Sequence, residues 1–339
     1  MRPGVGYEKA KGTEKAKGEA KGKAKGWGDN ASSPETPRLK LTVPMPPSAD
    51  PTMLSPLVAG VWRMGEWGQD VQTRLRWIEQ CLDLGITSFD HADIYGDHTV
   101  EDLFGQALAL APGLRQRMQI VTKCGIRLAS AHRPNNRVKH YDTSAAHVQR
   151  SVENSLRALR TEQIDLLLIH RPDALMDPDE LAATFERLRA SGKVRAFGAS
   201  NHSSSQFALL HGRHRLVAHQ IELSVLQMKA LADGTLDQCL DLGVRPMVWS
   251  PLAGGRLFTD AGPQAQRLRA EMEAMASRLE VSLTTLAYAW ILRHPSKPHP
   301  ITGTRRVEGL REACAALNLR LDAQDWYALW QASMGQPVP

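Results

Sequence analysis

From residue 38 onward, short apolar runs alternate with amphipathic segments along the chain. We interpret eight short, mainly apolar runs as strands: 57–61, 86–89, 118–122, 164–169, 194–199, 216–221, 244–249 and 299–301. Between and after them lie segments with helical periodicity: 70–84, 98–110, 143–160, 178–191, 203–212, 228–242, 264–279 with 282–293, 306–317, and a surface helix at 322–332. Consecutive apolar positions are typical of parallel strands that are covered on both faces.

Eight strand–helix units predict an α/β fold, a closed (β/α)8 TIM barrel over residues 38–339 rather than an open doubly wound sheet. A dinucleotide-binding open sheet would carry G-x-G-x-x-G after its first strand. The nearest approach, Gly4-Val5-Gly6, precedes the strands and opens no βαβ unit. We also expect a small N-terminal hairpin at 39–43 that plugs the bottom of the barrel, and an extra C-terminal helix.

The first 37 residues differ from the rest in composition. They repeat Lys, Ala and Gly, and they carry +3 of the formal net charge of +6. Very few of their side chains could be buried, so we predict a disordered tail that is inert or solubilising. A tether to nucleic acid or to a membrane surface is the alternative, which the interleaved acidic residues weaken. The remaining chain keeps a mild positive excess that could attract an anionic ligand.

The four cysteines contain no C-x-x-C pair, and no apolar run approaches the roughly 18 residues of a spanning helix. The N-terminus also lacks the apolar core of a secretory signal. These features predict a cytoplasmic protein without a membrane or nucleic-acid partner. Twelve histidines form no H-E-x-x-H motif, so we expect no catalytic metal. No pattern in the sequence indicates the oligomeric state.

Polar residues follow three consecutive predicted strands, where a barrel of this kind carries its chemistry. Asp90 ends the second strand and is followed by Tyr95, Lys123 ends the third, and His170 ends the fourth. Each has an ordinary interpretation as a turn, rim or strand-end residue. Their coincidence on one rim favours a functional site.

The chemistry of such a cluster follows from charge. Lys123 beside Asp90 would form an ion pair, and a cation next to Tyr95 would lower the pKa of the phenol from about 10. A tyrosine of this kind can donate a proton to a developing alkoxide. His170 would orient the carbonyl oxygen through a hydrogen bond.

The later strand ends offer groups that suit a nicotinamide cofactor. Asn201 and Gln220 could hold a carboxamide, and Trp249 offers a flat face for the ring. Gly254-Gly255 would let main-chain amides approach a pyrophosphate. Arg305 and Arg306, at the start of a predicted helix, suit a 2′-phosphate, which favours NADPH over NADH.

These motifs resemble the aldo-keto reductase family over roughly residues 38–339. The resemblance rests on Gly85–Gly96 with Glu101 and Gly105, on Ile169–Pro172, on Ser191–Asn201 and on Trp249–Leu252. More narrowly, it points to a bacterial branch of predicted oxidoreductases. It implies a catalytic tetrad of Asp90, Tyr95, Lys123 and His170. It also implies a cofactor-binding set: Ser200, Asn201, Gln220, Trp249, Ser250, Leu252, Gly254, Gly255, Arg256, Gly303, Thr304, Arg305 and Glu312. Glu312 is followed by Ala313 where the family usually shows Asn, so one adenine contact differs.

The resulting hypothesis is an NADPH-dependent enzyme that reduces an aldehyde or ketone by hydride transfer, with Tyr95 as the proton donor and Trp62 in the substrate pocket. A non-catalytic NADP(H)-binding sensor or docking subunit on the same fold is the alternative. A third interpretation, a pyridoxal-phosphate barrel with Lys123 as Schiff base, fits Asn201, Gln220 and Trp249 less well. The substrate is a small carbonyl compound that the sequence does not identify further.

Overall fold

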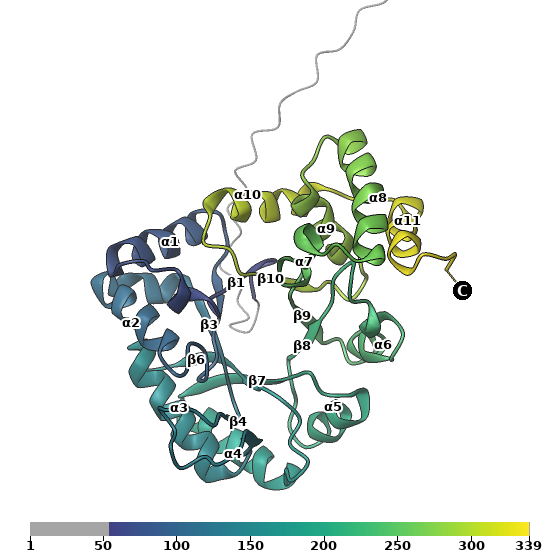
Figure 1. The fold of residues 1–339 in the computed structure, drawn as a ribbon. Coiled ribbons are helices and arrows are strands. Elements are labelled where there is room, and N and C mark those ends of the chain that lie inside the picture. The colour runs from purple at the N-terminus through teal and green to yellow at the C-terminus, as the bar shows by residue number, and fades with distance from the viewer. Residues whose placement is uncertain (1–53, 339) are drawn as a thin grey trace, which may run out of the picture. The chain divides into compact units, whose positions relative to one another are not determined.

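The computed structural model describes residues 54–338. Within this range the barrel strands are β1 (Val58–Gly60), β2 (Ser88–Asp90), β3 (Gln119–Cys124), β6 (Ile164–Ile169), β7 (Val194–Ser200), β8 (Ala218–Glu222), β9 (Arg245–Trp249) and β10 (His299–Thr302). They are parallel and close in the order β1-β10-β9-β8-β7-β6-β3-β2 (Figure 1). The predicted closed (β/α)8 barrel is confirmed. The predicted hairpin at 39–43 and the tail at 1–37 lie outside the described residues.

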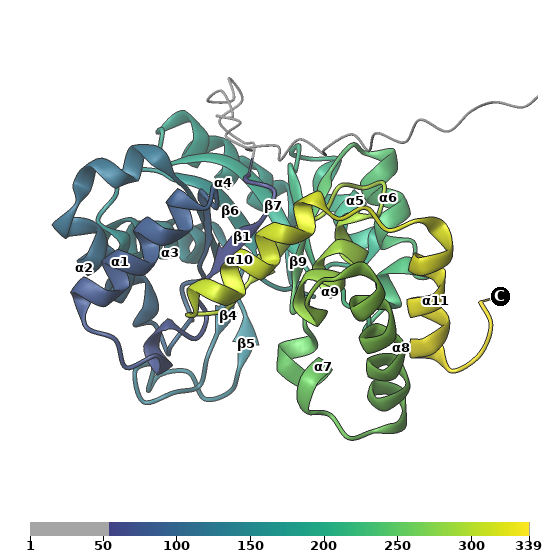
Figure 2. The same ribbon diagram turned by 90° about the horizontal axis from the view of Figure 1, so that it is seen from above.

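The helices surround the barrel (Figure 2). They are α1 (Val71–Asp83), α2 (Val100–Leu110), α3 (Ala145–Leu159), α4 (Pro178–Ala190), α5 (Ser204–His211), α6 (Thr235–Asp241), α7 (Arg256–Thr259), α8 (Pro263–Leu279), α9 (Leu283–Leu292), α10 (Val307–Ala315) and α11 (Ala323–Met334). Several begin where a side chain caps the first turn. Asp70 accepts a hydrogen bond from the amide of Thr73, and Ser203 forms a reciprocal capping box with Gln206.

The strands are rich in apolar residues because both of their faces are buried. In β6, Leu166 and Leu168 lie in the cluster that fills the barrel interior. Leu167 and Ile169 lie in the cluster between the strands and the helices. Side chains alternate between the two faces of a strand, so a parallel barrel needs apolar residues at both parities. This double burial produces the consecutive apolar runs in the sequence.

One predicted helix is divided in the structure. The segment 228–242 forms a short 3-10 helix, η3 (Lys229–Leu231), and then α6. Between them Gly234 has a φ of 80°, in the left-handed region that a right-handed helix cannot contain. The Asp233-Gly234 dipeptide is a turn signal that helical periodicity alone overlooks.

The structure adds a C-terminal helix and a short antiparallel strand pair to the barrel, and the first of these was expected from the sequence. The expected C-terminal helix is α11, where Trp326 stacks on Trp290 of α9 with ring centroids 5.0 Å apart. The long segment after β3 contains an antiparallel pair, β4 (Ile126–Arg127) and β5 (His140–Tyr141), which is not among the predicted strands. No helix in the described range is long and apolar enough to span a bilayer.

Candidate active site

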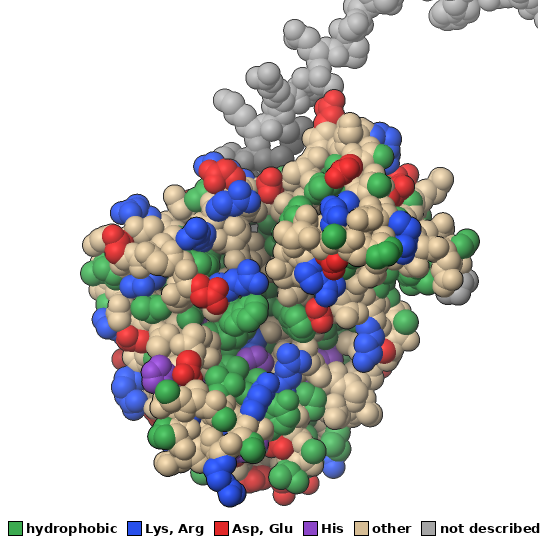
Figure 3. Space-filling view, viewed as in Figure 1, with side chains coloured by type: hydrophobic (Ala, Val, Ile, Leu, Met, Phe, Trp, Pro, Cys, Tyr) green, Lys and Arg blue, Asp and Glu red, His purple; other side chains and the backbone are tan. Residues whose placement is uncertain are grey.

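The residues at the C-terminal end of the barrel continue the inward-facing rows of the strands. Leu166 and Leu168 fill the interior, and His170, two positions further, directly follows β6. The same step of two leads from Val121 to Lys123, from Ala218 to Gln220 and from Met247 to Trp249. The inward-facing side chains are therefore apolar inside the barrel and mainly polar at its C-terminal end. Figure 3 shows basic and histidine side chains near the middle of this face, among hydrophobic ones.

Lys123 lies at the centre of the candidate site and is fully buried. Its Nζ donates to Asp90 Oδ2 at 2.8 Å, to the main-chain oxygen of His91 at 2.7 Å and to Tyr95 OH at 2.8 Å. Burial lowers the pKa of Lys123, and the Asp90 carboxylate opposes that shift. Three acceptors around one nitrogen match the three protons of an ammonium group. The expected Lys123–Asp90 ion pair is confirmed.

The pKa of Tyr95 is raised well above its usual value, because the phenol is buried and lies beside Asp90. The expectation that Lys123 would lower this pKa was wrong in direction, since it considered one charge and omitted burial. Tyr95 thus keeps its proton in the resting protein. Its oxygen accepts from Lys123, and the distance from Tyr95 OH to Asp90 Oδ2 is 3.5 Å, too long for a strong bond. The phenolic proton is therefore available to another acceptor.

His170 stands beside Tyr95, with ring centroids 6.1 Å apart and the rings nearly perpendicular. Its main-chain amide donates to the oxygen of Cys124 at 2.9 Å, which fixes the start of the loop after β6. Burial holds the pKa of His170 well below its usual value, so the ring is neutral at physiological pH. A neutral imidazole carries one N–H donor, which suits a hydrogen bond to an uncharged carbonyl oxygen.

The amides and Trp249 form a linked group on the opposite strands. Trp249 Nε1 donates to Asn201 Oδ1 at 3.0 Å, and Asn201 Nδ2 donates to Ser200 Oγ at 2.7 Å. Gln220 Nε2 donates to Asp90 Oδ1 at 2.7 Å, a contact that the sequence analysis did not foresee. Asn201 has a φ of 58°, a strained conformation for a residue other than glycine. The arrangement leaves the Gln220 carbonyl oxygen and the Ser200 hydroxyl proton for a bound carboxamide.

The segment after β9 exposes its main chain. Ser250, Gly254 and Gly255 have φ values of 54°, 69° and 97°, and a Cβ at either glycine would meet nothing within 4 Å. An anionic group such as a diphosphate can therefore approach these amides closely. Leu252 packs against the hydrophobic core beneath them, and the exposed Arg256 lies 3.8 Å from Asp260. The local structure fits the cofactor that the sequence analysis expected.

The segment between β10 and α10 carries the remaining candidates. Arg305 Nη1 donates to the main-chain oxygen of Trp67 at 3.0 Å, which anchors the guanidinium while its other N–H groups stay available. Thr304 Oγ1 accepts from the amide of Arg306 at 3.1 Å. Gly303 is exposed, and Glu312 contributes its main-chain oxygen to a bond from Thr285. Trp62, in the loop after β1, is 58 % exposed, with the Arg63 guanidinium over its ring.

A buried polar network behind the tetrad escaped the sequence analysis. Glu101 accepts from Thr122 Oγ1 at 2.5 Å and from Ser155 Oγ at 2.9 Å. Ser151 Oγ donates to Asp93 at 2.6 Å. The signal was present, because Asp93 lies between Asp90 and Tyr95 and Glu101 belongs to the same motif. The partners come from α3 and β3, and only the packed structure brings them together.

Comparisons with known proteins show which family the chain belongs to. The family model described as "Aldo/keto reductase family" matches residues 56–333. The chain is 48 % identical over 288 residues to "Oxidoreductase YdhF" of Escherichia coli (strain K12), covering 84 % of this chain and 95 % of that protein. It is 43 % identical over 293 residues to "6-dehydroglucose reductase" of Agrobacterium fabrum, covering 86 % of this chain and 98 % of that protein.

A solved structure with the same architecture supports the assignment. An aldo/keto reductase from Klebsiella pneumoniae, in complex with NADP and acetate, matches with a TM-score of 0.69 and 26 % sequence identity. The match covers 84 % of this chain and 93 % of that one. The bacterial relatives agree with the branch indicated by the sequence motifs. This chain belongs to the aldo/keto reductase family of oxidoreductases.

Proposed function

We propose that this protein is an NADPH-dependent reductase that converts the carbonyl group of an aldehyde or ketone to an alcohol at the barrel mouth. The observation that carries the proposal is the contact of Lys123 Nζ with Tyr95 OH at 2.8 Å, which places a cation beside the oxygen that would lose its proton. The NADP bound in the Klebsiella structure supports the choice of cofactor. The name of the Agrobacterium relative supports small sugar-like carbonyl compounds as the first substrates to test.

Tyr95 and His170 act on the carbonyl oxygen from neighbouring positions. The neutral His170 ring donates a hydrogen bond that orients the oxygen. Tyr95 donates its proton to the same oxygen as negative charge develops there. NADPH, when bound, supplies the hydride.

Lys123 acts on the tyrosine after proton transfer. As Tyr95 loses its proton, the ammonium 2.8 Å away stabilises the phenolate in a site without bulk water. Asp90 and the His91 carbonyl hold the ammonium in place, and Gln220 holds the other oxygen of Asp90. The same contacts count against a Schiff-base role, because a nucleophilic lysine needs a free, neutral amine.

The remaining candidates bind the cofactor along the later strand ends. Ser200, Asn201 and Gln220 would hold the carboxamide, Trp249 would offer its face to the nicotinamide ring, and Gly254 and Gly255 would present amides to the diphosphate. Arg305 would hold the 2′-phosphate that distinguishes NADPH from NADH.

Replacing Arg305 with Ala should weaken NADPH much more than NADH. A guanidinium–phosphate contact is a charge-assisted bond worth about 1.5–3 kcal/mol, so we expect kcat/KM for NADPH to fall about tenfold or more. The value for NADH should change little. The assay follows loss of nicotinamide absorbance with a small aldehyde as substrate, and the exposed Arg311→Ala on α10 serves as the matched control. Equal losses for both nucleotides would place the 2′-phosphate elsewhere, and inactivity of the wild type with every carbonyl compound would contradict the proposed reaction.

A further inference from the structure

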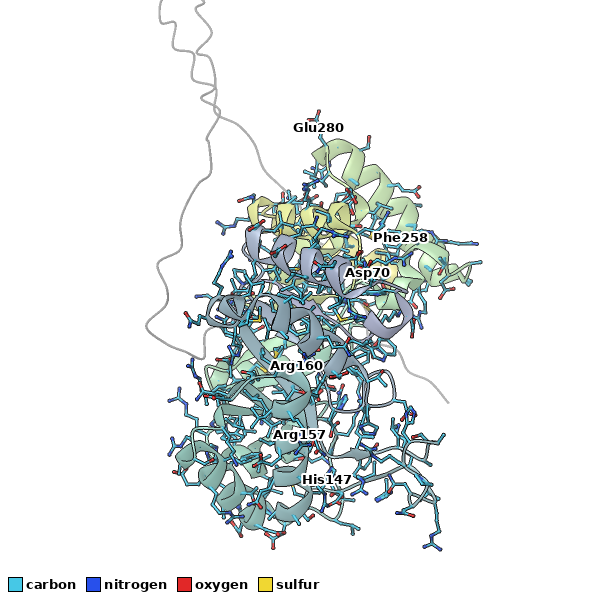
Figure 4. The ribbon with its side chains drawn as sticks, turned by 90° about the vertical axis from the view of Figure 1, so that its left-hand side faces the viewer. Asp70, His147, Arg157, Arg160, Phe258 and Glu280 are labelled. Carbon is cyan, nitrogen blue, oxygen red and sulfur yellow. The ribbon has the colours of Figure 1, made fainter. Side chains whose placement is uncertain are left out.

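A cavity lies outside the barrel mouth. It has a volume of about 610 Å³ and is bounded by α2, α3 and the segment that contains β4. Its wall includes Asp93, His147, Arg133, Arg150 and Arg157, but not Tyr95, His170 or Trp249. Figure 4 faces this side of the barrel, where His147 and Arg157 lie on α3 and Arg160 directly follows its last residue. The cavity is therefore separate from the site of hydride transfer.

Buried polar atoms in the cavity wall lack partners. His147 is 8 % exposed, and within residues 54–338 its Nε2 makes no hydrogen bond. The same holds for Asp93 Oδ1. Arg127 Nη1 lies 3.5 Å from His147 Nδ1 and can only donate, so this contact favours the tautomer of the neutral ring that carries its proton on Nε2. Burial lowers the pKa of His147 to about 4, which keeps the ring neutral. A buried N–H without a partner is a group that a ligand can satisfy.

The wall of the cavity carries both signs of charge, with Arg127, Arg133, Arg150 and Arg157 against Asp93, Glu101 and Asp102. In the part of the chain that the structure describes, Arg133, Arg150 and Arg157 have no carboxylate within 4.0 Å. Arg127, by contrast, pairs with Asp142 at 3.0 Å. The Glu101 carboxylate is already occupied by two hydroxyl donors, and burial raises its pKa. The cavity therefore presents unpaired guanidinium groups beside a buried N–H donor.

We propose that this cavity is a second binding site, for a small oxyanion such as a phosphate ester or a carboxylate, held by Arg150 and Arg157 of α3 with Arg133 and His147 Nε2–H. Guanidinium groups bind both kinds of oxyanion through paired N–H donors. The site also touches the catalytic region, because Asp93 of its wall lies between Asp90 and Tyr95. Its main-chain amide donates to the oxygen of Lys123 at 3.0 Å, and Ser151 joins its side chain to α3.

Calorimetric titration of the full chain with sodium sulfate, in saturating NADPH, tests this proposal. Saturating nucleotide keeps sulfate from the cofactor phosphate positions. We expect saturable binding to the wild type that the double variant Arg150→Gln/Arg157→Gln weakens about tenfold or more, given two charge-assisted bonds. The control is Arg187→Gln/Arg189→Gln, which removes the same charge from exposed positions of α4 and should leave sulfate binding within about twofold of the wild type.

Three results would overturn the proposal. The wild type does not bind sulfate, both double variants lose sulfate affinity equally, or sulfate binds only in the absence of NADPH. Thermal unfolding of each variant shows whether the fold is intact, and His147→Leu supplies a second test without a change of charge. Parallel titrations with glycerol phosphate and with succinate distinguish a phosphate ester from a carboxylate as the ligand. The test does not depend on the proposed reaction, because sulfate binding is measured as heat and not as turnover.

Discussion

Replacement of Tyr95 by Phe should abolish carbonyl reduction and leave NADPH binding unchanged. The substitution removes one oxygen atom, the proposed proton donor. General acids contribute about 10²–10⁴-fold, so we expect kcat to fall by about a thousandfold. The ring keeps its packing against His170 and the neighbouring core. Lys123 loses one acceptor but retains Asp90 and the His91 carbonyl, so the site should remain intact.

Steady-state kinetics and a nucleotide titration on the same protein separate the two effects. The matched control is Tyr141→Phe, because Tyr141 of β5 is 38 % exposed and loses the same atom. We expect the control to retain the wild-type kcat. A Tyr95→Phe protein that keeps more than about a tenth of the activity would exclude Tyr95 as the essential acid. Loss of NADPH binding in that variant would instead make Tyr95 a cofactor-binding residue.

Replacement of Lys123 by Met should both inactivate and destabilise the protein. Lys123 is fully buried, and Asp90 is 3 % exposed. Removing the cation leaves a buried carboxylate without compensation, which typically costs about 3–5 kcal/mol of unfolding free energy. Catalysis is lost as well, because no positive charge stabilises the Tyr95 phenolate. Urea unfolding and kcat measure the two consequences.

A double-mutant cycle separates the structural role of Lys123 from the chemical one. Adding Asp90→Asn to Lys123→Met removes the uncompensated charge, so most of the lost stability should return while the activity does not. Lys193→Met is the control, because its ion pair with Glu153 is half-exposed and should contribute less than about 1 kcal/mol. Wild-type stability in Lys123→Met would contradict the buried ion pair. Recovery of activity in the double variant would contradict the role assigned to the lysine.

The sequence predicted the barrel well because double burial of parallel strands leaves a strong local signal. The run Ile164–Ile169, for example, matches β6 residue for residue. Lys123 and His170 were found by the same logic, since a barrel places its polar residues where the inward-facing rows end. Helical periodicity alone did not predict the break at Gly234, where one glycine with positive φ divides the expected helix.

Properties that depend on tertiary packing were harder to predict. The pKa of Tyr95 was expected to shift downward, because sequence proximity suggests charges but not burial. The contact of Gln220 with Asp90 joins residues 130 positions apart, across the barrel mouth. The cavity proposed to bind an oxyanion is bounded by α2, α3 and the segment around β4. None of these segments carries a recognisable ligand motif by itself.

The central claim, that NADPH binds at the barrel mouth against Trp249, is tested most directly by intrinsic fluorescence. NADPH and then NADH are titrated into the wild type, Trp249→Phe and Trp330→Phe, the last changing a tryptophan of α11. We predict saturable quenching by NADPH at lower concentrations than by NADH, most of it absent in Trp249→Phe and retained in Trp330→Phe. A wild type that responds to neither nucleotide would contradict the account.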